Sequence, residues 1–154
     1  MAMYSRILLA VDLTADSVSV GERAQALAGA LAAELHVIHV VEPLLTVAPM
    51  APEPVAPVIV TTETELFDTA QAQIRGLGRK LGVPETRCHV VAGSTKSEIV
   101  RIASEQDMDL IVIGARERHG LALLFRQTED SVLHHAPCDV LAVRIGDDSK
   151  SRKR

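Results

Sequence analysis

Aromatic side chains are nearly missing from this chain: they make up 2% of its 154 residues, with no tryptophan and one tyrosine, Tyr4. Proteins that bind single-stranded nucleic acid commonly stack the bases on such rings, so that class of function is disfavoured. The net charge of -4 points the same way, because nucleic acid is bound by an excess of positive charge. The basic tail Lys150–Arg154 is the exception, and we interpret it as a solvated end of the chain.

Cysteines are also scarce. The chain has Cys88 and Cys138 but no C-x-x-C sequence, so neither a redox pair nor a zinc site is indicated. Two lone thiols in apolar, strand-like runs fit the reducing cytosol. No apolar run approaches the roughly 20 residues that span a bilayer, and Asp12 ends the first run too early for a secretion signal. The sequence therefore predicts a cytoplasmic protein that does not insert into membranes.

Aliphatic residues, by contrast, are abundant, and hydrophobic residues make up 47% of the chain. Short apolar runs, typical of strands buried on both faces, alternate with segments in which apolar residues recur at helical spacing. Strands are expected at residues 7–11, 35–41, 88–92, 110–113 and 140–143. Helices are expected after Thr14, over 62–81, after Thr95 (where Thr95-Lys-Ser-Glu98 has the form of a capping box) and over Leu123–His135. Pro43–Pro57 holds five of the seven prolines and is expected to be a mobile loop or flap.

This alternation predicts an α/β fold with a doubly wound parallel sheet, because helical crossovers join parallel strands. With neither a repeat nor a second composition zone, we expect one domain over residues 1–146 and a charged, disordered tail over 147–154. Ligands of such sheets bind at the carboxyl ends of the strands, where the strand order reverses. Asp12 ends the first strand and Gly114 the fourth, so the two residues would meet across that crevice if these strands are neighbours.

Five segments, spread over nearly the whole chain, carry a family resemblance. They are Tyr4-Ser-Arg-Ile-Leu-Leu-Ala-Val-Asp12, Leu35-His-Val-Ile-His-Val-Val-Glu-Pro43, Met108-Asp-Leu-Ile-Val-Ile-Gly114, His119-Gly-Leu-Ala-Leu-Leu124 and Val132-Leu-His-His-Ala-Pro-Cys-Asp-Val-Leu-Ala-Val143. With them the chain resembles the universal stress protein family, specifically its small single-domain bacterial A-type members. The resemblance implies a Rossmann-like fold of the adenine nucleotide alpha hydrolase-like architecture, with five parallel strands in the order 3-2-1-4-5. It also implies a homodimer built by pairing of the last strands, here through Val140, Leu141, Ala142 and Val143.

The resemblance further points to a nucleotide site with an altered phosphate loop. Nucleotide-binding members of the family carry G-x-x-G after the fourth strand and a Gly-Ser or Gly-Thr pair at the start of the last helix. Carried over by position, the first glycine is Gly114, the second falls on Glu117, and the pair falls on Arg126-Gln127. In such relatives the acid matching Asp12 lies near the ribose. Backbone at the positions of Ala10 and Val40 lies near the adenine.

Loss of these glycines has a direct physical consequence. Glycine lets backbone N–H groups approach a phosphate and tolerates positive φ, whereas Glu117 adds a side chain and a negative charge. At about 4 Å, like charges cost on the order of 4 kcal/mol at an effective dielectric near 20. A micromolar affinity is worth about 8 kcal/mol in total. Arg116, Arg118 and Arg126 oppose this effect because guanidinium groups neutralise phosphates.

We therefore predict that the protein needs no cofactor, with ATP as the alternative. If a nucleotide does bind, the resemblance implies that it contacts seven residues: Ala10, Asp12, Val40, Gly114, Arg116, Arg126 and Gln127. An independent interpretation of Asp12 is that its carboxylate caps the following turn through the N–H groups of Thr14 or Ala15. Both roles are compatible.

Metal and hydrolase sites are disfavoured. His134 and His135 are adjacent and would point about 100° apart on a helix. His36 and His39 are separated by an odd number of residues and would lie on opposite faces of a strand. Neither pair makes a good chelate, so no metal is expected. Ser131 near the paired histidines lacks the G-x-S-x-G elbow of a hydrolase.

The sequence is best interpreted as a non-catalytic cytoplasmic homodimer that acts in the stress response through contacts with an unknown protein partner. One alternative is an ATP-binding regulator that controls a partner such as a transporter. An alternative from another class is a slow ATPase or related nucleotide hydrolase. No general base, metal-binding carboxylate pair or positioned nucleophile can be placed near Gly114, which disfavours the enzyme.

Overall fold

Five parallel strands form one sheet in the order β3-β2-β1-β4-β5. The computed structural model describes residues 2–43, 63–116, 132 and 134–145. In chain order the elements are β1 (Arg6–Ala10), α1 (Ser17–Leu31), β2 (Glu34–Val41), α2 (Glu63–Leu81), the short 3-10 helix η1 (Glu85–Arg87), β3 (Cys88–Ala92), α3 (Thr95–Glu105), β4 (Leu110–Arg116) and β5 (Asp139–Ile145). The predicted fold class and strand order are thus confirmed.

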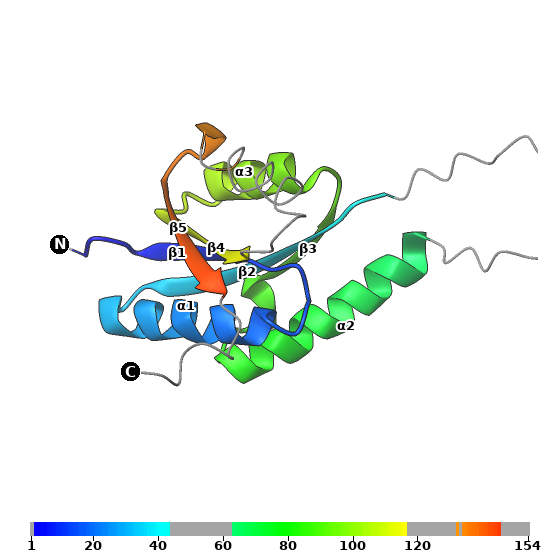
Figure 1. Ribbon diagram of the computed structural model, residues 1–154, viewed down its shortest axis with the longest axis horizontal. Helices are drawn as coiled ribbons and strands as arrows, with labels where there is room; N and C mark the ends of the chain where they lie inside the picture. Colours follow the sequence, from blue (N-terminus) through cyan, green and yellow to red (C-terminus); the bar gives the residue numbers. More distant parts are fainter. Residues whose placement is uncertain (1, 44–62, 117–131, 133, 146–154) are drawn as a thin grey trace, which may run out of the picture.

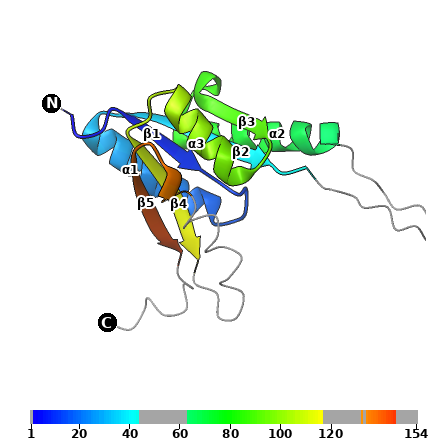
Figure 2. The ribbon, with the colours of Figure 1, turned by 90° about the horizontal axis from the view of Figure 1, so that it is seen from above.

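Helices cover both faces of the sheet: α1 and α2 lie on one face, and α3 lies on the other (Figure 1). In Figure 2 the sheet is seen from the α3 side, with β4 and β5 together at one edge. Side chains alternate between two cores, as the period of a strand requires. In β1, Ile7 and Leu9 pack in the core under α1 and α2, whereas Leu8 packs in the core under α3. All three are fully buried, and each such burial contributes about 1.5–3 kcal/mol.

The amino end of β1 is fixed to the loop before β4. Asp109 Oδ2 accepts hydrogen bonds from the backbone N–H groups of Ser5 at 2.6 Å and Arg6 at 2.9 Å. These bonds hold the pKa of the Asp109 carboxyl below its usual range. They therefore hold β1 next to β4, so the carboxyl ends of both strands face the same crevice.

Strand β4 is longer than the sequence predicts. It does not end at Gly114 but continues through Ala115 to Arg116. The physical reason is pairing with β5, whose ladder runs to the pair Arg116↔Ile145. Gly114 is therefore a strand residue opposite Val143, and the expectation that a loop begins there is wrong.

Several predicted features lie outside the described residues. Of the expected last helix, Val132, His134 and His135 are helical, and the remaining positions 123–131 and 133 are not described. The same holds for residues 44–57 of the expected flap, for Glu117, Arg118, Arg126 and Gln127, and for the tail 147–154. None of the described helices combines the length and apolarity needed to cross a membrane.

Candidate ligand-binding cleft

A cleft of about 680 Å³ opens at the carboxyl ends of β1, β2 and β4, where the strand order reverses. This volume lies within the range typical of small-molecule sites. Four of the seven residues assigned from the sequence line it together: Ala10, Asp12, Val40 and Gly114. Arg116 belongs to β4 by its backbone, and Arg126 and Gln127 lie outside the described residues.

Asp12 organises the turn between β1 and α1. Its Oδ1 atom accepts hydrogen bonds from the Thr14 N–H at 3.1 Å, from the Thr14 hydroxyl at 2.7 Å and from the Ser17 hydroxyl at 3.1 Å. The capping interpretation of Asp12 is thereby confirmed, through Thr14. Leu13 between them takes a φ of 59°, a left-handed conformation that the surrounding bonds maintain. Asp12 is thus a structural residue of the cleft wall whatever the ligand.

His39 lies in the same wall and was not among the residues assigned from the sequence. Its Nδ1 atom lies 2.9 Å from the backbone carbonyl oxygen of Val11. Because a carbonyl oxygen only accepts, Nδ1 must carry the proton, and in the neutral ring Nε2 is then an acceptor. The available sequence signal was the position of His39 near the end of an apolar strand in an expected crevice. Its partner Val11 follows the neighbouring strand β1, so the contact could not be identified from the sequence alone.

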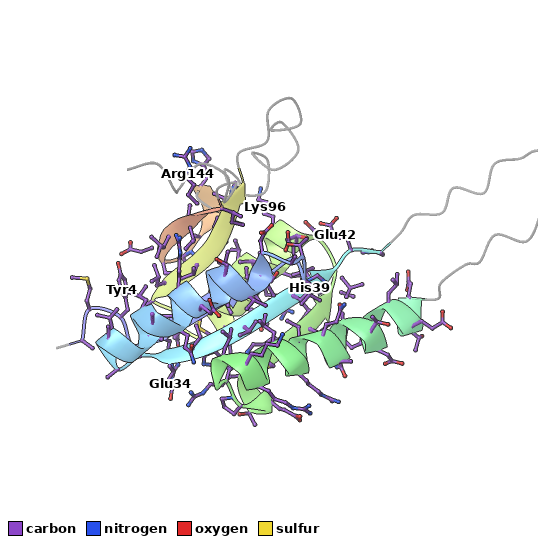
Figure 3. The ribbon with its side chains drawn as sticks, turned by 60° about the horizontal axis from the view of Figure 1, so that its bottom comes forward. Tyr4, Glu34, His39, Glu42, Lys96 and Arg144 are labelled. Atoms are coloured by element: carbon purple, nitrogen blue, oxygen red, sulfur yellow. The ribbon has the colours of Figure 1, made fainter. Side chains whose placement is uncertain are left out.

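Glu42 follows β2 directly and is also a lining residue that the sequence did not single out. Its Oε1 atom accepts a hydrogen bond from the Thr95 hydroxyl at 2.6 Å and another from the Thr95 N–H at 3.2 Å. These bonds lower the pKa of Glu42, so it is a carboxylate at neutral pH. Figure 3 shows His39 and Glu42 at the same end of β2.

Gly114 lies in a closely packed position. A β-carbon at this position would lie 2.8 Å from Ile145 Cδ1 and 3.2 Å from Val20 Cγ2. Its φ is not positive, so the residue is not needed for a left-handed turn. The close approach of these β5 and α1 side chains therefore favours a small residue at this position, independently of any phosphate.

Charge in the cleft has one sign among the described lining residues. These include the acids Asp12, Asp16 and Glu42 together with His39, and they include no lysine or arginine. Lys96 is close in sequence to Thr95 and lies near this end of the sheet, but it does not line the cleft (Figure 3).

The other candidate groups lie elsewhere. His36 and His89 contact each other, with Nδ1 of His36 3.2 Å from Nε2 of His89. His134 and His135 are exposed, and both cysteines are half-buried with pKa values raised by burial. Across residues 2–43, 63–116, 132 and 134–145, no group of three His, Cys, Asp or Glu side chains is arranged to hold a metal ion.

Comparison with known proteins gives a consistent result. The model of the universal stress protein family matches residues 3–144. Universal stress protein A homologs 1 and 2 of Coxiella burnetii are 35% and 37% identical to this chain, over 91% and 94% of it and 96% and 98% of their own length. A solved universal stress protein in complex with cAMP is similar with a TM-score of 0.58 and 20% identity, covering 91% of this chain and 96% of that one. At that identity, the likeness to this last protein concerns the fold alone.

Proposed function

The chain belongs to the universal stress protein family, and from that premise we propose that it is a non-catalytic, cytoplasmic member acting in the stress response. In this proposal residues 1–146 form its single domain, and 147–154 are an appended tail. It works as a homodimer through contacts with a protein partner, and its cleft does not hold ATP with useful affinity.

One observation carries the part of the proposal that concerns ATP. The glycine that remains from the phosphate motif, Gly114, is paired within the sheet opposite Val143, and the strand continues to Arg116. A phosphate loop needs backbone N–H groups that are turned toward the ligand, and pairing with β5 directs part of the N–H groups of residues 114–116 into the sheet. The motif positions that follow carry Glu117 and the pair Arg126-Gln127 in place of glycines.

A second candidate is an ATP-binding regulator that controls a partner such as a transporter. It is favoured by the cleft itself, which brings Ala10, Asp12 and Val40 together, and by the relative of the same fold that holds cAMP. The arginines at 116, 118 and 126 would then have to supply the phosphate contacts. A slow ATPase is the least supported candidate. It needs positive charge to stabilise the transferring phosphoryl group, and the described lining residues carry no Lys or Arg.

Strand β5 supports the homodimer. It pairs with β4 on one side and is the last strand in the sheet order. Leu141 in this strand is 41% exposed, and Ala142 is exposed beside it. An apolar edge strand favours association, and a second copy of the same strand would cover it with two-fold symmetry.

Mass analysis of the native, purified protein tests the proposal in one sample. The expected spectrum is that of a dimer without bound nucleotide. A dimer that carries adenine nucleotide after purification without added ligand would favour the ATP-binding regulator. A monomer would remove the homodimer from the proposal.

A further inference from the structure

We propose that the outer edge of β3 is an interaction surface, where an extended, acidic segment of a partner protein adds to the sheet as a further strand. The inference deepens the proposed function and rests on it, because it says where the partner binds and which chemistry the partner presents. It follows from the backbone of this edge, from the side chains on both faces of the strand and from the charge beside it.

Strand β3 lies at the edge of the sheet that the proposed dimer does not use. It pairs with β2 on one side and is the first strand in the sheet order. Figure 2 shows it on the side of the sheet away from β4 and β5. If the β5 strands of two copies pair with each other, the two β3 strands lie at the outer ends of the joined sheet. Dimerisation would therefore leave both β3 edges available to a partner.

The backbone of β3 presents polar groups on its outer side. Gly93 N–H donates a hydrogen bond of 3.0 Å to the carbonyl oxygen of the last residue of β2. Consecutive residues of a strand turn these groups to opposite sides, so the N–H and C=O groups of Val90 and Ala92 face away from β2. Cys88 faces the same way, but its N–H is already bonded to the Glu85 carbonyl oxygen. Among the described strands only β2 pairs with β3, and an added strand would bond to these outward groups.

The side chains of β3 offer apolar contact on both faces of the sheet. Val90 packs against the core under α1 and α2, and Val91 packs against the core under α3. Both are only half-buried, and Ala92 at the end of the strand is exposed. A partner strand with apolar residues at alternate positions would cover the surface that these side chains leave open.

The chain that leads into β3 carries a local excess of positive charge. Residues 75–88 contain four basic side chains and one acidic side chain, whereas the whole chain has a net charge of -4. Arg75 and Arg79 are exposed, and their spacing of four residues places them on one side of α2. Arg87 directly precedes β3 and is held by Glu34 at 3.1 Å. A partner that approaches this edge therefore meets the guanidinium groups of α2.

Helix α2 brings these arginines close to the edge. A β-carbon at Gly78 would lie 2.7 Å from Cys88 Sγ, so this turn of α2 lies against the start of β3. Arg75 has a long ion pair with Glu85, at 4.0 Å, and both side chains are more than half exposed. Because exposed ion pairs contribute little to stability, Arg75 can exchange Glu85 for a carboxylate of the partner. Charge complementarity thus favours an acidic segment over a basic one.

Nuclear magnetic resonance titration of the isotopically labelled, full-length protein with two synthetic peptides tests the inference. Both peptides have capped ends and valine at alternate positions, and the remaining positions are glutamate in one peptide and lysine in the other. We expect the glutamate peptide to bind at least about tenfold more tightly than the lysine peptide. Its binding should shift the backbone amide resonances of Val90 and Ala92.

The possible failures separate this inference from the proposed function. If the glutamate peptide does not bind at millimolar concentration, binds no more tightly than the lysine peptide, or leaves the Val90 and Ala92 resonances unchanged, the inference is overturned. A nucleotide-free dimer would still satisfy the proposed function in each of these cases. Shifts confined to β5 would overturn the inference and would also contradict the proposed homodimer, because that edge would then be open to the peptide.

Two variants test the named groups, with thermal unfolding as a check that each variant folds. Ala92→Pro removes one outward N–H at an exposed position and keeps the bonds to β2, so affinity for the glutamate peptide should fall about fivefold. Arg75→Gln combined with Arg79→Gln should lower it about threefold or more, whereas Arg23→Gln, an exposed change on α1, should leave it unchanged. Unchanged affinity in Ala92→Pro would overturn strand addition at this edge, and unchanged affinity in the double variant would overturn the role of charge.

Discussion

The hydroxyl of Thr95 donates a hydrogen bond of 2.6 Å to Oε1 of Glu42, and the backbone N–H of Thr95 donates a second bond of 3.2 Å to the same atom. The two residues are 53 positions apart in sequence. Their contact joins the end of β2 to the first residue of α3. A carboxylate at the amino end of a helix is also stabilised by the helix dipole, so Glu42 serves as a cap supplied by another element.

Thr95→Val should therefore destabilise the protein, because the Glu42 carboxylate loses its hydroxyl donor. Both groups are near the surface, so the expected loss is only about 1 kcal/mol. Thr64→Val, near the start of α2, is the matched control and should have a smaller effect. The pKa of Glu42 is lowered in the folded state, so its contribution is present above about pH 4.3, the unfolded value, and is lost as the pH falls through the folded pKa. Urea unfolding at neutral pH and at pH 3 measures the destabilisation caused by Thr95→Val. A destabilisation of equal size at both pH values would contradict its assignment to the Glu42 carboxylate.

Two glycines in α2 should respond in opposite directions to alanine. At Gly76 a β-carbon meets nothing within 4 Å, so Gly76→Ala should stabilise the protein by about 0.5–1 kcal/mol through helix propensity. At Gly78 a β-carbon would lie 2.7 Å from Cys88 Sγ and 3.1 Å from the backbone oxygen of Val83, so Gly78→Ala should destabilise it by about 1–3 kcal/mol. Urea unfolding of both variants measures the change in the free energy of unfolding. A change of the same sign in both would show that packing against β3 does not decide the outcome.

The His36–His89 pair should make stability depend on pH near neutrality. Burial is the main cause that lowers the pKa of both rings, and the neighbouring Arg87 and Arg6 lower that of His36 further, while Glu34 opposes them. The unfolded chain thus binds more protons, and stability falls as the pH drops below about 6.5 through the folded values, by at most about 1.4 kcal/mol per pH unit for each ring. Protonation of both rings would also break their 3.2 Å hydrogen bond.

The measurement is the free energy of unfolding between pH 7.5 and about 5. The double variant His36→Gln with His89→Gln should flatten this slope, whereas His135→Gln, at an exposed position, should retain it. The slope is the readout, so an overall loss of stability in the double variant does not affect the comparison. An unchanged slope in the double variant would assign the pH dependence to other groups.

Dimerisation through β5 should be lost when a charge replaces Leu141. In the proposed dimer Leu141→Lys places two lysines near the two-fold axis, and like charges directly opposite each other destabilise strand pairing. Ala26→Lys, on the exposed side of α1, introduces the same charge far from that edge and should remain dimeric. Light scattering across the micromolar range distinguishes the variants. A wild-type monomer, or a Leu141→Lys dimer as stable as wild type, would place the interface elsewhere or remove it.

Much of the fold could be predicted because the sheet is buried on both faces. Such strands are continuous apolar runs, so β2 and β3 were expected within one residue of their observed bounds, and the crossovers implied the parallel sheet. The end of β4 was missed because Gly114, Ala115 and Arg116 carry no apolar pattern, and their strand conformation comes from pairing with β5.

The site was predicted less completely because its contacts join distant parts of the chain. Asp12, Ala10 and Val40 could be assigned from strand ends and from the family resemblance. The capping box over Thr95–Glu98 was wrong in detail: Ser94 is the N-cap, Thr95 bonds to Glu42, and Glu98 pairs with Arg101. A local motif cannot show that a residue 53 positions away competes for the same hydroxyl.

The most direct test of the central claim is calorimetric titration of Mg-ATP into wild-type protein and into the variant Glu117→Gly, Arg126→Gly, Gln127→Ser. We expect weak or undetectable binding to wild type and an affinity at least about tenfold higher in the variant, because backbone donors become accessible and the carboxylate is removed. Glu117→Gln alone separates the two causes. A large recovery of ATP affinity assigns the weak binding to charge repulsion, and a small recovery assigns it to lost access to backbone N–H groups. Wild-type binding at low micromolar concentration or tighter would contradict the account, since the arginines would then have replaced the missing glycines.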